Sequence, residues 1–249
     1  SIMKQLLLLP YRFYIIFIWF PTMWFLTVMC ALTEILMIAI GCFSPKQLML
    51  PAKIWSRICL WCAFIKLDLR GIENIKEGQS YVFAANHQSM FDIWAIYGWI
   101  PTPFAWMMKK EIRKIPFVGL ACERLGHIFV DRTNPIAAHK SMEQAKKTLT
   151  NGHSIVIFPE GTRTKNGKIG AFKRGAFAIA VDLKLPIIPV TISGSFERKA
   201  WNGFNINPGT IIVTYHPAIN TAMQDNADIK QIANEVKESV SSALPEKNK

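Results

Sequence analysis

The residues best suited to acid–base chemistry form the block Asn86-His87-Gln88-Ser89-Met90-Phe91-Asp92. A carboxylate that accepts the proton on one histidine ring nitrogen fixes the tautomer and leaves the other nitrogen as a general base. The spacing of His87 and Asp92 permits such a pair. The same block also fits a structural role, because Ser89-x-x-Asp92 is a capping box at a helix N-terminus. The spacing alone therefore predicts either a catalytic pair or a helix cap.

A second polar block, Phe158-Pro159-Glu160-Gly161-Thr162-Arg163, follows the strongest strand-like run of the chain. Its proline and glycine favour a tight turn. That turn would hold Glu160 and Arg163 at the same sheet edge as His87. The planar guanidinium of Arg163 suits a phosphate, and a basic loop follows it. The alternative is an ordinary turn with a surface ion pair.

A third block, Lys109-Lys110-Glu111-Ile112-Arg113-Lys114-Ile115-Pro116, interleaves basic and apolar residues, and Asp131-Arg132 lies further on. A surface of this kind suits anionic lipid headgroups. A solvated helix face is the more usual interpretation of such a run, and both interpretations stay open on composition alone.

Strand-like and helix-like segments alternate around these blocks, which predicts an α/β domain with a central mixed, largely covered sheet flanked by helices. The two catalytic-type blocks each follow a predicted strand, so they should meet at one sheet edge. The expected strands span residues 81–85, 127–130, 154–158, 187–192 and 211–215, and the expected helices span 53–64, 90–99, 136–150, 172–183 and 227–244.

The N-terminal segment has a different character, because Glu34 is the only charged residue between positions 13 and 43. One straight helix over this run would measure about 46 Å, against about 30 Å for a hydrocarbon core. Pro21 also interrupts the run. We therefore expect two shorter apolar helices that anchor the protein in a membrane, with residues 1–50 as the anchoring segment and 51–249 as the α/β domain.

Basic residues lie on both sides of this apolar segment, at Lys4, Arg12, Lys46, Lys53 and Arg57. This distribution favours both ends on the cytoplasmic side, as in a hairpin or an interfacial helix pair. A single transmembrane span is the alternative. The run is too long for an ordinary cleaved signal and lacks a convincing cleavage site.

The composition narrows the choice of partners. The 249 residues carry a formal charge of +12, half of them are hydrophobic, and the mean hydropathy is +0.20. A basic chain favours an anionic partner, and the apolar N-terminus favours a membrane over a nucleic acid. The five cysteines form no disulfide or metal pattern: Cys59 and Cys62 lie in an apolar helical context that indicates core packing. No metal site is expected.

Together these blocks resemble the lysophosphatidic acid acyltransferase (1-acylglycerol-3-phosphate acyltransferase) family. His87 and Asp92 match its N-H-x-x-x-x-D motif, and Glu160, Gly161 and Arg163 match its phosphate-binding motif. The segments KKEIRKIPFVG and LPIIPV are similar to two further blocks of the family. The four blocks occur in the family's order between about residues 80 and 195, which makes the resemblance specific.

The resemblance implies transfer of a fatty acyl group from an acyl-CoA or acyl-carrier-protein thioester to the sn-2 hydroxyl of lysophosphatidic acid. The product would be phosphatidic acid, in phospholipid biosynthesis. It implies no metal, no other cofactor and no covalent acyl-enzyme. A related enzyme acting on glycerol-3-phosphate or another lysolipid is the alternative. A thioesterase or lipase is not favoured, because the chain has no G-x-S-x-G elbow.

In this family, His87 would act as the general base and Asp92 would stabilise its imidazolium. Arg163, with Lys109 or Lys110, would hold the phosphate of the acceptor. The remaining residues of the predicted binding turn are Glu160, Gly161 and Thr162. The expected partners are the phospholipid membrane, lysophosphatidic acid and the acyl thioester, with no nucleic acid. The expected location is the cytoplasmic face of the inner membrane.

Overall fold

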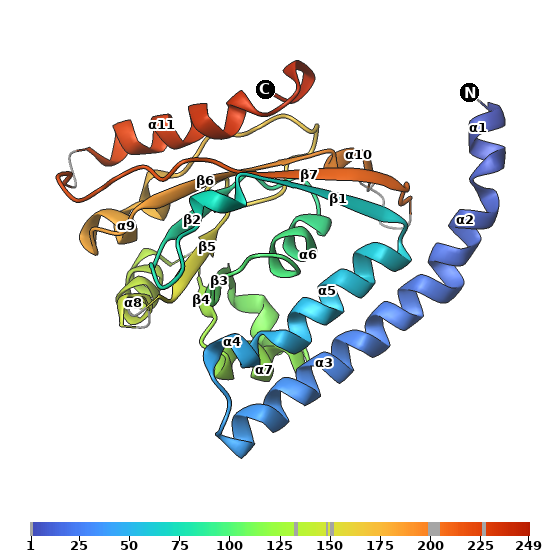
Figure 1. Cartoon of the computed structure of the whole chain (residues 1–249), viewed down its shortest axis with the longest axis horizontal. Helices are drawn as coiled ribbons and strands as arrows, with labels where there is room; N and C mark the ends of the chain where they lie inside the picture. Colours follow the sequence, from blue (N-terminus) through green and yellow to red (C-terminus); the bar gives the residue numbers. More distant parts are fainter. Residues whose placement is uncertain (1, 132–133, 148, 150–151, 199–204, 226–227) are drawn as a thin grey trace.

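The computed structural model describes residues 2–131, 134–147, 149, 152–198, 205–225 and 228–249. A seven-stranded sheet crosses the molecule in the order β1-β7-β6-β2-β5-β3-β4, with helices on both faces (Figure 1). All neighbouring strands are parallel except β6 and β7, which pair antiparallel. The predicted mixed, covered sheet is therefore confirmed. The strands are β1 (Ile65–Arg70), β2 (Val82–Ala85), β3 (Phe104–Lys109), β4 (Ile128–Val130), β5 (Ser154–Ile157), β6 (Ile187–Ser193) and β7 (Gly209–Tyr215).

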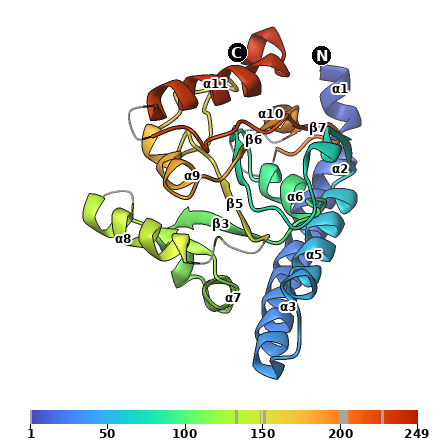
Figure 2. The same ribbon diagram turned by 60° about the vertical axis from the view of Figure 1, so that its left-hand side comes forward.

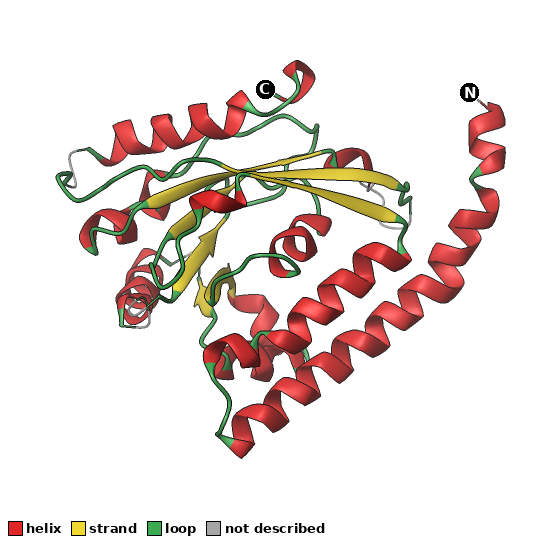
Figure 3. Cartoon of the chain, viewed as in Figure 1, coloured by secondary structure: helices red, strands yellow, loops and turns green. Residues whose placement is uncertain are grey.

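The helices agree with the predicted positions after residue 50, apart from their ends (Figure 3). The segment predicted over 172–183 resolves into a 3₁₀ turn, Arg174–Ala176, followed by a short helix. The helices are α1 (Ile2–Leu7), α2 (Leu9–Tyr14), α3 (Phe20–Ile40), α4 (Pro45–Leu48), α5 (Leu50–Cys62), α6 (Phe91–Tyr97), α7 (Val118–Arg124), α8 (Pro135–Lys146), α9 (Ala178–Asp182), α10 (Ser195–Arg198) and α11 (Ile229–Ser242).

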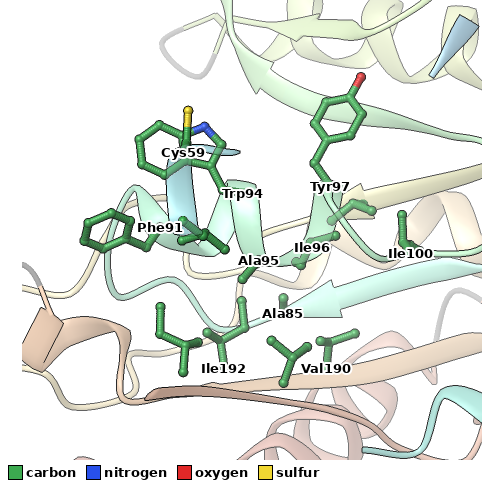
Figure 4. Packing of buried hydrophobic residues seen from close by; sticks show 14 of the residues in the cluster. Cys59, Ala85, Phe91, Trp94, Ala95, Ile96, Tyr97, Ile100, Val190 and Ile192 are labelled. Atoms are coloured by element: carbon green, nitrogen blue, oxygen red, sulfur yellow. The ribbon is translucent and has the colours of Figure 1, made fainter. Parts of the chain in front are cut away.

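Alternating side chains of the central strands supply two cores, one on each face of the sheet. In β2, Phe83 and Ala85 join the core beneath α5 and α6, whereas Val82 and Ala84 join the core beneath α9 and α11. Figure 4 shows the first core from close by, with the residues of α6 stacked above Ala85 and its strand neighbours. Burial on both faces explains why these strands read as continuous apolar runs.

The prediction that Pro21 divides the apolar N-terminal segment into two helices is wrong. Helical structure runs without a break from Leu9 to Ile40, long and apolar enough to cross a membrane. The proline is accommodated by a wide π-helical turn over Ile15–Trp19, which places the N–H of Phe20 on the carbonyl of Ile15. Such a turn removes the clash between a proline ring and the carbonyl four residues earlier. The chain then turns back, and α5 runs alongside α3 (Figures 1 and 2).

The long helix has one face in the protein and one face outside it. Ile15, Trp19 and Met23 are buried in the same core as α5 and α6, and the indole N–H of Trp19 donates to the carbonyl of Cys59 at 2.9 Å. By contrast, Phe17 and Phe25 are 60% and 63% exposed. Only 17% of the most apolar window is buried, and an exposed apolar surface of this extent is typical of a helix in contact with lipid. Membrane association and the domain boundary at residue 50 stay predictions.

Strands β1 and β3 and helix α7, as well as the short helices α4 and α10, were missed in the sequence. Strand β1 alternates Ile65, Leu67 and Leu69 with charged residues, a period-two signal that does predict an edge strand. Strand β3 and helix α7 gave no clear periodicity. The basic block from Lys109 onward is the end of β3 followed by a 3₁₀ helix, Lys110–Lys114, rather than one face of an α-helix. Arg132 lies outside the described residues.

Candidate active site

The sheet topology brings the two polar blocks side by side. Strands β2 and β5 are parallel neighbours, with Ala84 opposite Ile157, so the residues that follow each strand leave the same edge. Asn86 ties this edge to β6: its amide donates to the carbonyl of Ile192 at 2.9 Å and accepts from the Ile192 N–H at 2.7 Å. The carboxyl edge of a parallel sheet is where α/β proteins bind ligands.

His87 and Asp92 form the pair that their spacing permits. The Nδ1 of His87 lies 2.8 Å from the Oδ2 of Asp92, and the carboxylate is fully buried. The same oxygen accepts the backbone N–H groups of Gln88 at 2.6 Å and Ser89 at 2.8 Å. Asp92 therefore serves as both turn cap and histidine partner. Because Nδ1–H donates to the carboxylate, Nε2 is left as the basic nitrogen.

The ring of His87 is held by stacking as well as by its carboxylate. It lies parallel to the ring of Phe158, with centroids 3.9 Å apart and an interplanar angle of 14°. Phe158 in turn stacks on Trp106 of β3 at 5.7 Å. The stack and the carboxylate contact together fix the plane of the imidazole ring.

Glu160 binds the backbone of both neighbouring segments. Its Oε1 accepts the N–H of His87 at 2.8 Å, and its Oε2 accepts the N–H of Gly170 at 2.7 Å. Burial raises the pKa of this carboxyl, although the two N–H donors oppose the shift. Both oxygens are thus engaged within the protein, and Glu160 is absent from the residues that line the cavity described below.

Gly161 is required by the geometry of the turn. Its φ is +78°, a conformation that disfavours a side chain. A Cβ at this position would also stand 2.8 Å from the Nζ of Lys173, so the glycine lets a lysine ammonium lie against the turn. The turn that carries Arg163 therefore has a second cation beside it.

A cavity of about 590 Å³ opens beside the His87 ring. Five of the eight predicted site residues line it, His87, Lys109, Gly161, Thr162 and Arg163. Lys110 instead pairs with Asp131 at 2.6 Å and is absent from this lining. The rest of the wall is mainly apolar and comes from α3, α5, α6, β3 and α7.

The cavity includes residues that the sequence did not single out as functional. Helix α3 contributes Thr27, Cys30, Ala31 and Glu34, so the predicted anchor also builds the site. The sequence did contain a signal for Glu34, because it is a charged residue within an otherwise apolar helix.

A buried polar cluster supports the basic loop from behind. The carbonyl of Gly167 accepts the side-chain amides of Gln88 at 3.1 Å and Asn248 at 2.8 Å. The backbone carbonyl of Asn248 accepts the N–H of Ile169 at 2.9 Å. These contacts join the loop after Arg163 to the residue that follows His87 and to a segment far along the chain.

This fold and site define an acyltransferase. A family model described as Acyltransferase matches residues 66–193, half of the chain, and the chain belongs to that family. The 1-acyl-sn-glycerol-3-phosphate acyltransferase of Pseudomonas aeruginosa is 33% identical over 198 residues, covering 77% of this chain and 76% of that protein. The alpha form from Mus musculus is 34% identical over 179 residues, covering 71% of this chain and 62% of that one.

A chloroplastic member from Arabidopsis thaliana is 31% identical over 70% of this chain, which spans about half (49%) of that protein. Among solved structures, the lysophosphatidic acid acyltransferase PlsC of Thermotoga maritima superposes with a TM-score of 0.73 at 26% identity. That match covers 96% of each chain.

Proposed function

We propose that the protein moves a fatty acyl group from an acyl thioester, acyl-CoA or acyl carrier protein, to the sn-2 hydroxyl of lysophosphatidic acid. The product is phosphatidic acid, and the reaction belongs to phospholipid biosynthesis. The observation that carries this proposal is a His87–Asp92 pair in one cavity with Arg163 and Lys109. The names of the similar proteins support lysophosphatidic acid as the acceptor.

The chemistry follows from the pair. An alcohol is a weak nucleophile, so Nε2 of His87 removes its proton as the oxygen attacks the thioester carbonyl. Buried Asp92 stabilises the imidazolium that results. The C–S bond then breaks, and the thiolate takes the proton back from the histidine. His87 and Asp92 need no covalent acyl-enzyme for these steps, and the expectation that no metal or cofactor takes part stays a prediction.

The cavity separates two kinds of substrate contact. Arg163 and Lys109 are cationic and suit the acceptor's phosphate, which would place the hydroxyl against the thioester. The apolar part, walled by α3, α5 and α7, suits the acyl chain of the donor. Because α3 also faces the membrane, a lysolipid can reach the site from the bilayer without crossing water. The cytoplasmic face of the inner membrane, where acyl thioesters are available, is the proposed location.

Kinetics of Arg163→Ala test the assignment, with Lys110→Ala as a matched control. Arg163 lines the cavity, whereas Lys110 is paired with Asp131 away from it. A bidentate charged contact is worth roughly 1.5–3 kcal/mol, so the KM for lysophosphatidic acid should rise about 10- to 150-fold in Arg163→Ala. Arg163→Lys should recover part of this loss, because a point charge lacks the fork. Lys110→Ala should leave the acceptor KM unchanged.

The opposite pattern identifies a different site. A large rise in the KM for the acyl thioester, with an unchanged acceptor KM, would assign Arg163 to the phosphates of coenzyme A. Purified protein assayed with labelled thioesters against lysophosphatidic acid, glycerol-3-phosphate and other lysolipids decides the acceptor. Faster transfer to glycerol-3-phosphate than to lysophosphatidic acid would overturn the proposed acceptor.

A further inference from the structure

The side chain of Glu34 is a carboxyl group whose burial in an apolar environment costs free energy. It lies in the apolar helix α3, its side chain is only 5% exposed, and it lines the cavity beside Ala31. The thiol of Cys30, one turn earlier on the helix, is a hydrogen-bond partner. Among the residues that the structure describes, its Oε1 has no hydrogen-bond partner. A buried polar atom of this kind normally has a partner, so this one points to a ligand.

A second hydrogen-bonding group, the hydroxyl of Tyr97, belongs to a residue that lines the same cavity. The N–H of Trp106 donates to Nδ1 of His127 at 3.0 Å, so that nitrogen carries no proton in the neutral ring. The proton is on Nε2, which lies 3.3 Å from the hydroxyl oxygen of Tyr97 and donates to it. The hydroxyl hydrogen of Tyr97 is therefore left to donate elsewhere. Figure 4 shows this side chain pointing away from Ala85 and Val190 on the sheet.

Tyr97 and Glu34 both line this cavity. The negative charge of Glu34 contributes to the raised pKa of Tyr97, after burial, and to that of Cys122, which burial and Glu34 raise to about 12. The cavity wall therefore holds a hydroxyl donor and a carboxylate acceptor together, within a mainly apolar lining. An alcohol is the simplest ligand group that can accept from one and donate to the other.

We propose that Glu34 and Tyr97 form a polar subsite in the acyl cavity that selects donors whose acyl chain carries a hydroxyl group. This inference rests on the proposed function, since it assigns the apolar cavity to the donor chain. A saturated chain that fills the cavity leaves the Glu34 oxygen without a partner. A hydroxyl at the matching depth completes its hydrogen bonds, and sites that bind a substrate hydroxyl in this way discriminate against chains that lack it.

Competition between donors tests the subsite. The donors are hexadecanoyl-CoA and a set of hexadecanoyl-CoA thioesters that carry one hydroxyl at successive positions along the chain. With the intact protein and lysophosphatidic acid, one position should be used about tenfold better, by kcat/KM, than the saturated donor. Glu34→Leu should abolish that preference and raise the rate with the saturated donor. Glu34→Gln, which keeps a hydrogen-bonding oxygen, should retain most of the preference.

The matched control is Glu123→Leu, the same change on α7 at a carboxylate that pairs with Arg113 and is half exposed. It should leave the ranking of donors unchanged. Wild-type protein that uses no hydroxylated donor better than the saturated one would overturn the proposal, as would an unaltered preference in Glu34→Leu. If lysophosphatidic acid accepts no acyl group from any donor, the proposed function fails by itself. Equilibrium binding of the same thioesters to wild type and Glu34→Leu then still tests the subsite, and equal affinities of the wild type for saturated and hydroxylated chains refute it.

Discussion

The backbone N–H of His87 donates to the Oε1 of Glu160 at 2.8 Å, and this bond connects the two motifs of the site. The other oxygen of Glu160 holds Gly170, at the far end of the basic loop. One carboxylate thus determines how the histidine stands relative to the loop that follows Arg163. A charged acceptor suits this role, because its hydrogen bonds are roughly twice as strong as neutral ones.

Glu160→Gln should lower kcat at least about tenfold and leave both KM values nearly unchanged. The amide keeps one acceptor but presents an N–H₂ group to one of the two backbone donors, which loses its partner. Steady-state kinetics compared with Glu123→Gln, a surface carboxylate, provide the measurement. A lower KM for the acceptor in Glu160→Gln would contradict this role, since it would mean that the carboxylate repels a phosphate.

His87→Ala should reduce acyl transfer by about 10²- to 10⁴-fold, the usual effect of losing a general base. The protein should remain folded, because the main packing contact of the ring is its stack on Phe158. Transfer assays and thermal unfolding of the same preparations provide the test. A folded His87→Ala protein that retains more than half of the wild-type rate would rule out the general base.

Asp92→Asn should lose both activity and stability. The Oδ2 atom accepts from His87 and two backbone N–H groups at once, and a neutral amide oxygen in its place would accept all three more weakly and would leave the imidazolium without a charged partner. We expect a loss of about 1–3 kcal/mol in the free energy of unfolding, together with most of the activity. An unchanged unfolding midpoint would show that the cap is dispensable and the histidine contact is the main role.

Asn248→Ala should raise the KM for lysophosphatidic acid about 3- to 10-fold, with a smaller effect on kcat. The amide holds the carbonyl of Gly167 in the loop after Arg163, and a neutral hydrogen bond of this kind contributes roughly 0.5–1.5 kcal/mol. Asn248→Asp should be worse, because a carboxylate repels the carbonyl oxygen. Equal effects on acceptor and donor KM would indicate general loosening instead.

His127 should make the protein less stable in acid. Burial lowers its pKa from 6.5 to about 4, so the unfolded chain takes up the proton first as the pH falls. Stability from this group is complete above pH 6.5 and is lost progressively down to about pH 4, by roughly 2 kcal/mol at pH 5. Unfolding curves of wild type and His127→Asn in detergent, at pH 7 and pH 5, measure it. The variant should lose less stability between the two pH values.

The sequence predicted the contact between His87 and Asp92 because local spacing determines it: the two residues belong to one turn and the helix that follows. It also predicted that Arg163 would share their edge, since each block follows a buried parallel strand. What it could not show depends on contacts between distant segments. The two backbone partners of Glu160, and the support from Asn248, are visible only once the chain is folded. Helix α3 was recognised by its hydropathy, which does not distinguish a face against lipid from a face against a cavity.

The double role of α3 has a consequence for how this protein can be rebuilt. An unrelated transmembrane segment grafted in place of residues 1–45 would restore tethering, yet it would bring no counterpart of Trp19 for the core or of Ala31 for the cavity wall. One helix therefore provides both the membrane anchor and part of the cavity wall. For this reason, removal of the anchor should not yield a soluble fragment that is still active.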